Sequence, residues 1–168
     1  MNSREDSMQH IIDFIKNPCL IVPLVTWFIA QLIKVIITAI VNKEFRIERM
    51  WGDGGMPSGH SATVCSLATM CGLSCGFGTP FFALACVYAV VVMHDATGVR
   101  REAGKQAVTL KKLALIVNDA VSDPDKRIRT EKLKVLVGHT PLQVFVGALI
   151  GILVALCYYW IFGITSAV

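Results

Sequence analysis

Residues 61–93 read SATVCSLATMCGLSCGFGTPFFALACVYAVVVM and contain no charged side chain. Gly76-Phe77-Gly78-Thr79-Pro80 interrupts this stretch, and its glycines and proline favour a short turn. The stretch therefore predicts a pair of apolar helices over about 60–76 and 79–97. Each has a length within the range of about 17–25 residues that a helix needs to cross a hydrocarbon core of about 30 Å.

The same pattern continues on both sides of this pair. Between Pro18 and Val41 the only charge is Lys34, and from Thr140 to Val168 there is none. Two more spans are predicted, over about 18–41 and 142–163. With 54% apolar and 17% charged residues, the chain is too apolar for a soluble domain of 168 residues. The predicted fold is an all-α integral membrane protein, one membrane domain over 1–168 with about four transmembrane helices.

Two polar segments flank these spans. Residues 1–17 lack the basic-then-apolar pattern of a signal peptide and are predicted to form a short amphipathic helix at the membrane interface. Residues 98–138 form a polar helical insertion between the third and fourth spans. Within it we expect a helix over 101–120, a break at Asp123-Pro124-Asp125 and a second short helix over about 129–137.

The basic residues are segregated to one side of this topology. Four spans place the 42–59 loop and the 98–138 segment on the same side, which then holds 13 of the 16 lysines and arginines. The positive-inside rule makes that side cytoplasmic, with both termini outside, in a bacterial-type plasma membrane. A basic site for a phosphorylated substrate would produce the same bias on either side.

Two histidines occur in matching contexts on this basic face. Gly59-His60-Ser61 opens the second span, where Ser58 can cap the helix, and Gly138-His139-Thr140-Pro141 opens the fourth. Backbone N–H groups and the helix dipole favour an anion at such a position. The dipole also disfavours imidazole protonation, which helps to keep one histidine neutral and nucleophilic. For either histidine alone, the alternative is a surface or capping role.

Several charged residues could complete an anion site. Arg100 and Arg101 leave the third span on the same face, and a guanidinium is a planar, bidentate partner for phosphate oxygens. The alternative for one of them is a positive-inside flank. Asp95, at the inner end of an apolar helix, is expected either to pair with an arginine or to orient a histidine. Lys34, within the first span, could snorkel to the basic face, bind phosphate, or do both.

These candidate residues belong to motifs that resemble those of a known family. Pro57-Ser58-Gly59-His60 matches the central signature of the type-2 phosphatidic acid phosphatase and vanadium haloperoxidase superfamily. Three stretches resemble, in order, its divergent bacterial and plant branch of small membrane proteins. They read GGMPSGHSA from Gly54, DATGVRREAGKQA from Asp95 and GHTPLQVFVG from Gly138. The resemblance covers roughly residues 18–153.

The resemblance implies a role for each candidate residue. His60 would act as general acid on the leaving group, with the Ser58 hydroxyl and the Gly59 N–H touching the phosphate. His139 would be the nucleophile that forms a phosphohistidine. The phosphate-binding cations would be Lys34, Arg49 and either Arg100 or Arg101. This chemistry needs no metal or other cofactor, because dipoles and cations stabilise the charge.

The chain departs from the superfamily pattern in three places. Nearly all of the 98–138 insertion separates Arg101 from His139, whereas the usual arginine lies six residues before the nucleophile. The partner aspartate four residues after the nucleophile is Gln143, which can orient an imidazole but carries no charge. The wide sequence separation of Lys34 and Arg49 stretches the first motif. Inserted helices could preserve the site in space, or hydrolysis could be lost while phosphate binding survives.

These residues are compatible with three functions. The first is a membrane phosphatase that hydrolyses a lipid phosphate or diphosphate, either phosphatidate-like or polyprenyl diphosphate. The second is a non-catalytic protein that binds or translocates a lipid-phosphate headgroup. The third, a structural membrane subunit, leaves both histidine motifs unexplained. The expected partners are the phosphorylated lipid and the bilayer, with no nucleic acid, and homo-oligomerisation is left open.

Overall fold

The computed structural model describes residues 3–42, 55–121, 123, 128 and 138–163. This part of the chain forms six α-helices and no β-strand. They are α1 (Ser3–Lys16), α2 (Pro18–Asn42), α3 (Gly59–Cys75), α4 (Pro80–Thr97), α5 (Val99–Ala120) and α6 (Pro141–Phe162). The prediction of an all-α membrane fold is confirmed.

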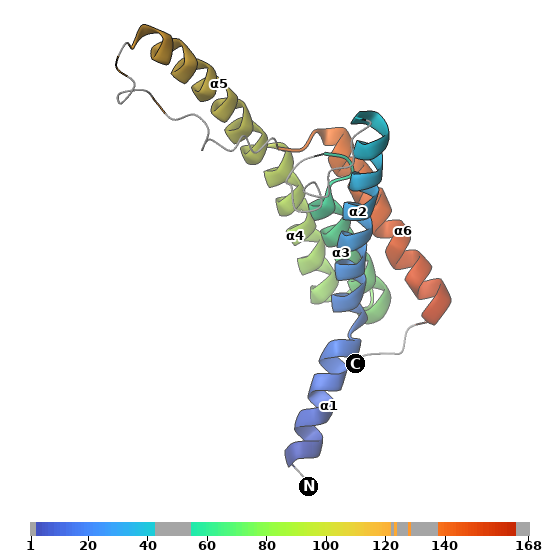
Figure 1. Cartoon of the computed structure of the whole chain (residues 1–168). Coiled ribbons are helices and arrows are strands. Elements are labelled where there is room, and N and C mark those ends of the chain that lie inside the picture. The colour runs from blue at the N-terminus through green and yellow to red at the C-terminus, as the bar shows by residue number, and fades with distance from the viewer. Residues whose placement is uncertain (1–2, 43–54, 122, 124–127, 129–137, 164–168) are drawn as a thin grey trace.

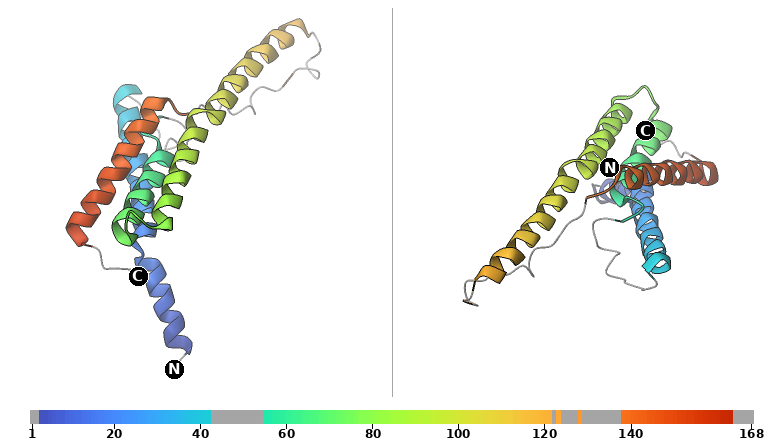
Figure 2. Two further views of the ribbon diagram at one scale, coloured as in Figure 1. Left: turned by 180° about the vertical axis from the view of Figure 1, so that it is seen from behind. Right: turned by 90° about the horizontal axis from the view of Figure 1, so that it is seen from above.

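Helix α3 is the centre of the bundle, with α2, α4 and α6 packed around it (Figures 1 and 2). Its small side chains allow this close packing: Ala62, Ser66 and Gly72 are all buried. The interface with α6 is especially close. A Cβ atom at Gly147 would overlap the carbonyl oxygen of Ser58, and one at Gly151 would overlap that of Ala62.

Three helical stretches are long and apolar enough to cross a membrane: Pro18–Val41, Pro80–Ala120 and Pro141–Phe162. The apolar part of the second stretch is α4. Helix α3 has 17 residues and rises about 25 Å, close to the thickness of a hydrocarbon core. It lies alongside the others inside the bundle, so the structure is consistent with the four predicted spans.

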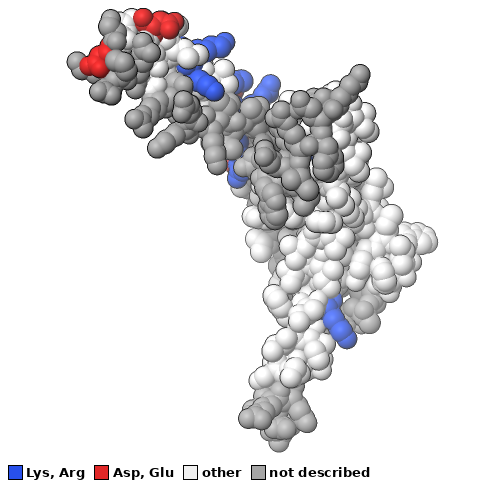
Figure 3. All heavy atoms as spheres, in the orientation of Figure 1, with Lys and Arg blue, Asp and Glu red and all other residues white. Residues whose placement is uncertain are grey.

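Helix α5 continues beyond the bundle from the end of α4 (Figure 1). Gly98 separates the two helices, and its N–H donates to the carbonyl of His94 at 2.8 Å. Lysines and arginines lie along α5. The visible surface between α5 and α1 carries almost no charged side chain among the described residues (Figure 3). The helix predicted over 101–120 is thus present, and the one predicted over 129–137 lies outside the described residues.

Helix α1 precedes the bundle, on the side opposite to α5 (Figure 1). The helix predicted within residues 1–17 is therefore confirmed. Its apolar side chains, Met8, Ile11, Phe14 and Ile15, are exposed. This exposure is compatible with the predicted location at the membrane interface, which stays a prediction.

Candidate functional site

The Pro-Ser-Gly-His turn is held in place by two helices. Ser58 is fully buried and caps α3: its hydroxyl oxygen accepts the Ser61 N–H at 3.3 Å and the Ser61 hydroxyl at 3.0 Å. The Ser58 N–H donates to the carbonyl of Gln143 in α6 at 3.0 Å. His60 is the second residue of α3, so its predicted place in the first turn is confirmed.

His139 lies just before the start of α6. Thr140 is the N-cap of that helix, and Pro141 occupies the first turn as predicted. The His139 N–H donates to the carbonyl of Ala96, in the last turn of α4, at 3.1 Å. The His139 side chain is 3% exposed. The end of α4 and the cap of α6 therefore fix its backbone on both sides.

The two histidine rings meet although they lie far apart in the sequence, on either side of α4 and α5. Their centroids are 6.1 Å apart and their planes are perpendicular. The start of α3 and the residue before the α6 cap are brought together by the close contact of these helices at Gly147 and Ser58. The two imidazoles therefore lie in direct edge contact at the candidate site.

Helix α2 contributes a third wall through Trp27, Gln31 and Lys34, which recur on one helical face. A Cβ atom at Gly59 would lie 3.5 Å from Trp27 Cδ1 and 3.9 Å from Gln31 Cδ. One at Gly55 would lie 3.5 Å from Cγ of Lys34. Lys34 is only 3% exposed, so its side chain is enclosed by protein and does not snorkel to solvent.

The start of α5 also reaches this region. A Cβ atom at Gly138 would overlap the backbone of Arg101, so the Arg100–Arg101 backbone packs directly beside the residue that precedes His139. The first turn of α5 thus lies beside the residue that precedes His139, although most of the inserted segment separates the two in the sequence. The Arg100 guanidinium is bound to the Asp95 carboxylate at 2.7 Å, with both side chains partly exposed. Of the two alternatives for Asp95, the structure shows ion pairing. Arg101 is exposed.

Gln143 has a capping interaction. Its side-chain oxygen accepts the Thr140 N–H at 3.0 Å, and its own N–H donates to the Thr140 hydroxyl at 3.4 Å, which forms a capping box. A role in orienting an imidazole stays a prediction for this residue. Arg49, the remaining predicted phosphate ligand, lies outside the described residues.

Sequence reasoning missed two sets of residues that build the site. The first is Trp27 and Gln31, whose helical spacing from Lys34 was the available signal. The side-chain oxygen of Gln31 is buried and accepts no hydrogen bond from the residues that the structure describes. The second is Gly147 and Gly151, which form a Gly-x-x-x-Gly motif of the kind that allows membrane helices to approach closely.

No group of three or more histidine, cysteine, aspartate or glutamate side chains is placed to hold a metal ion among the described residues. Ser58, Gly59, His60, His139 and Lys34 form the candidate site, at one end of the bundle. Its chemistry is that of two imidazoles, a helix N-terminus and a buried ammonium. These groups suit the binding of an anion rather than of a cation.

The fold and the site define a small helical membrane protein with paired histidines at the starts of two adjacent helices. Comparison of the sequence with known families agrees: the model of the divergent PAP2 family matches residues 15–154, and the chain belongs to that family. The chain is also 40% identical over 157 residues to the uncharacterized membrane protein YuiD of Bacillus subtilis (strain 168). This match covers 90% of the chain and 99% of the relative. No solved structure matches the chain.

Proposed function

We propose that the protein is a membrane phosphatase that hydrolyses a lipid phosphate or diphosphate through a histidine nucleophile. The observation that carries the proposal is the meeting of His60 and His139, with 6.1 Å between ring centroids, at the starts of two packed helices. A surface or capping role for each histidine separately would not require the two rings to meet. Membership of the divergent PAP2 family supports phosphatase-like chemistry.

The proposed reaction has two steps. A neutral ring nitrogen of His139 attacks phosphorus, the bond from phosphorus to the leaving oxygen breaks, and His60 donates a proton to that oxygen. Water then attacks the phosphohistidine, His60 takes a proton from the water, and the bond between nitrogen and phosphorus breaks to release phosphate. His60 is protonated again at the end, so the cycle is balanced.

The surroundings supply positive charge and donors for the phosphoryl oxygens. The Gly59 N–H, in the first turn of α3, has no acceptor among the described residues and is available to an anion. Lys34 supplies a buried ammonium within a span, and a cation is a strong partner for phosphoryl oxygens. We assign Arg49 and one of the two adjacent arginines, Arg100 or Arg101, to the same phosphoryl group.

A second candidate function is the binding or translocation of a lipid-phosphate headgroup without hydrolysis. The observation that favours it is Gln143, a neutral residue whose side-chain oxygen is already engaged in the capping box. A carboxylate at this position would stabilise a protonated imidazole, and an amide does so less. The two candidates share one ligand and differ in whether phosphorus is attacked.

Phosphate release separates the two candidates. Purified protein in liposomes is given phosphatidate or a polyprenyl diphosphate, and inorganic phosphate is measured. We expect release by the wild type and a loss of at least about 100-fold in His139→Ala and His60→Ala, the scale typical of essential acid–base groups. His94→Ala is the matched control, because His94 is exposed on the last turn of α4. Tight lipid binding without any phosphate release would favour the second candidate.

We further propose that the site opens to the cytoplasm of a bacterial-type plasma membrane. The reason is that 13 of the 16 lysines and arginines lie in segments on the same side of the membrane as the site. In right-side-out membrane vesicles, a membrane-impermeant amine reagent should label Lys16 and leave Lys105, Lys111 and Lys112 unmodified until the vesicles are opened. Labelling of the α5 lysines in sealed vesicles would contradict this orientation.

A further inference from the structure

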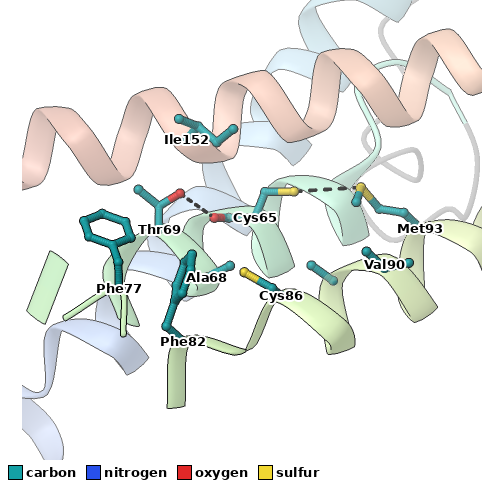
Figure 4. Close-up of a pocket in the computed structure, with 10 residues that line it drawn as sticks. Cys65, Ala68, Thr69, Phe77, Phe82, Cys86, Val90, Met93 and Ile152 are labelled. Carbon is teal, nitrogen blue, oxygen red and sulfur yellow. Dashed lines mark hydrogen bonds between the residues drawn. The ribbon is translucent and has the colours of Figure 1, made fainter. Parts of the chain in front are cut away.

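A groove with a volume of about 450 Å³ runs between α3, α4 and α6 (Figure 4). This volume falls within the range of about 300–1,000 Å³ that is typical of small-molecule sites. Phe77 and Phe82 lie at one end of the groove, and Val90 and Met93 lie at the other (Figure 4). None of the residues of the candidate site lines it.

The walls of the groove are apolar. Its lining consists of alanine, cysteine, valine, isoleucine, methionine and phenylalanine side chains, with Thr69 as the one hydroxyl. That hydroxyl donates to the Cys65 carbonyl at 2.8 Å and is therefore satisfied within its own helix. The Cys65 and Met93 sulfur atoms contact each other at 3.8 Å. A hydrocarbon suits these walls, whereas a polar group would be left without partners.

The position of the groove links it to the histidine site. Met93, at its upper end, lies one helical turn below Ala96, whose carbonyl accepts the His139 N–H. Along α4, the stretch from Phe82 to Met93 rises about 16 Å. From Ala96, at the level of His139, to Phe82 the rise is about 21 Å, which is more than half of a hydrocarbon core of about 30 Å. A ligand with its phosphate at the histidines would therefore direct its chain into the groove.

The lower end of the groove is closed by two aromatic rings. Phe77 and Phe82 pack edge to face with their centroids 5.1 Å apart. The Phe77 ring lies against Gly72, where a Cβ atom would come within 2.5 Å of it. One side of the groove is open to the bilayer, since Phe77 and Val90 are 64% and 63% exposed. A chain can therefore enter sideways from the leaflet and end at the rings.

We propose that this groove binds one alkyl or prenyl chain of the lipid whose phosphate is held by His60 and His139. The inference rests on the proposed function and extends it to the substrate: a single chain fills the groove down to the Phe77–Phe82 pair. Any second chain of the same lipid stays in the bilayer. The groove then selects for ligands whose chain is long enough to cover the distance of about 21 Å from the histidines to the rings.

Photo-crosslinking with hexadecylphosphonate tests this inference, because its chain is long enough to reach from the histidines to the rings and its carbon–phosphorus bond resists hydrolysis. One probe carries a diazirine at the terminal carbon and another carries it next to the phosphonate. The protein is reconstituted in phosphatidylcholine nanodiscs, and labelled residues are mapped by mass spectrometry. We expect the terminal probe to label Phe77 and Phe82, and the proximal probe to label Val90 and Met93.

Two variants on neighbouring positions make the test specific. Cys86→Phe fills the middle of the groove and should reduce labelling of Phe77 and Phe82 at least fivefold. Val87→Phe adds the same ring on the lipid-facing side of α4, where Val87 is 62% exposed, and should leave the labelling unchanged. Equal labelling in wild type and Cys86→Phe, or labelling mainly of lipid-facing residues such as Val91, would overturn the inference.

A hexadecanol probe with the same terminal diazirine separates this inference from the proposed function. Weaker groove labelling by the alcohol than by the phosphonate supports a chain that is anchored by its phosphate group. Equal groove labelling by both probes would overturn the link between the groove and the histidines, whereas the proposed function is overturned only by the absence of phosphate release. Phosphonate-dependent labelling that falls outside the groove would overturn the groove alone.

Discussion

Lys34 is a charged residue buried within a membrane span. Insertion scales assign a lysine at the centre of a span a cost of about 2.5–3.5 kcal/mol, and this one is 3% exposed. Snorkelling would have relieved that cost by carrying the ammonium to water. The structure instead encloses the side chain beside the Gly55 turn. We expect a buried cation beside the turn that leads into α3 to contribute to anion binding.

Replacing Lys34 tests this role directly. Lys34→Met should weaken the binding of hexadecylphosphonate about 10- to 100-fold, because one buried charge–charge interaction is worth about 1.4–2.8 kcal/mol here. Binding is measured by titration of the reconstituted protein. Lys105→Met is the control, since Lys105 is exposed and pairs only with Glu102 among the described residues. An unchanged affinity in Lys34→Met would remove this residue from the site.

The two histidines make the reaction dependent on pH in both directions. His139 must be neutral to attack, so the rate should fall as acid protonates it. His60 must be protonated to act as acid, so the rate should also fall as the pH rises through its titration.

A measurement of kcat/KM between about pH 5 and 9 should therefore give a bell-shaped curve. An aryl phosphate, whose leaving group needs no proton, distinguishes the roles of the two residues. With this substrate, His60→Ala should keep much more activity than His139→Ala and should lose the alkaline limb. Equal losses in both variants would contradict the assignment of acid and nucleophile.

At the scale of helices, the contact between α3 and α6 holds the site together. Gly147 and Gly151 allow the α6 backbone to approach the carbonyls of Ser58 and Ala62. The hydrogen bond from the Ser58 N–H to Gln143 then ties the two helix starts together. The positions of both histidines thus depend on glycines that carry no chemistry of their own.

Gly151→Leu should accordingly act on the fold and the site at once. The new side chain would collide with the Ala62 carbonyl, and overpacking costs about 1–3 kcal/mol or more. We expect a lower thermal unfolding temperature in detergent and a loss of phosphate release. Gly78→Leu adds the same bulk where nothing lies within 4 Å and should change neither. A Gly151→Leu protein with wild-type stability and activity would show that the close contact is dispensable.

At the scale of the whole molecule, the sequence predicts where the helices begin and end, but it does not predict which of their residues come into contact. The uncharged runs predict the spans because a charge is costly in hydrocarbon, and Ser58 and Pro141 predict two helix starts by local capping rules. The approach of His60 to His139 depends on tertiary packing between helices distant in the sequence, which periodicity does not encode. The Asp95–Arg100 ion pair is local, since the two residues are five positions apart, and the sequence allowed it without excluding a histidine as the partner of Asp95.

The most direct test of the central claim is to trap the phosphohistidine. Protein in liposomes is mixed with a lipid phosphate labelled with ³²P, quenched in alkali within milliseconds to seconds, and digested for mass spectrometry. We expect an acid-labile, alkali-stable phosphoryl group on His139. It should be present in wild type and in the His94→Ala control and absent from His139→Ala. Hydrolysis of the lipid with no phosphate on His139 at any time, or with phosphate on another residue, would contradict it.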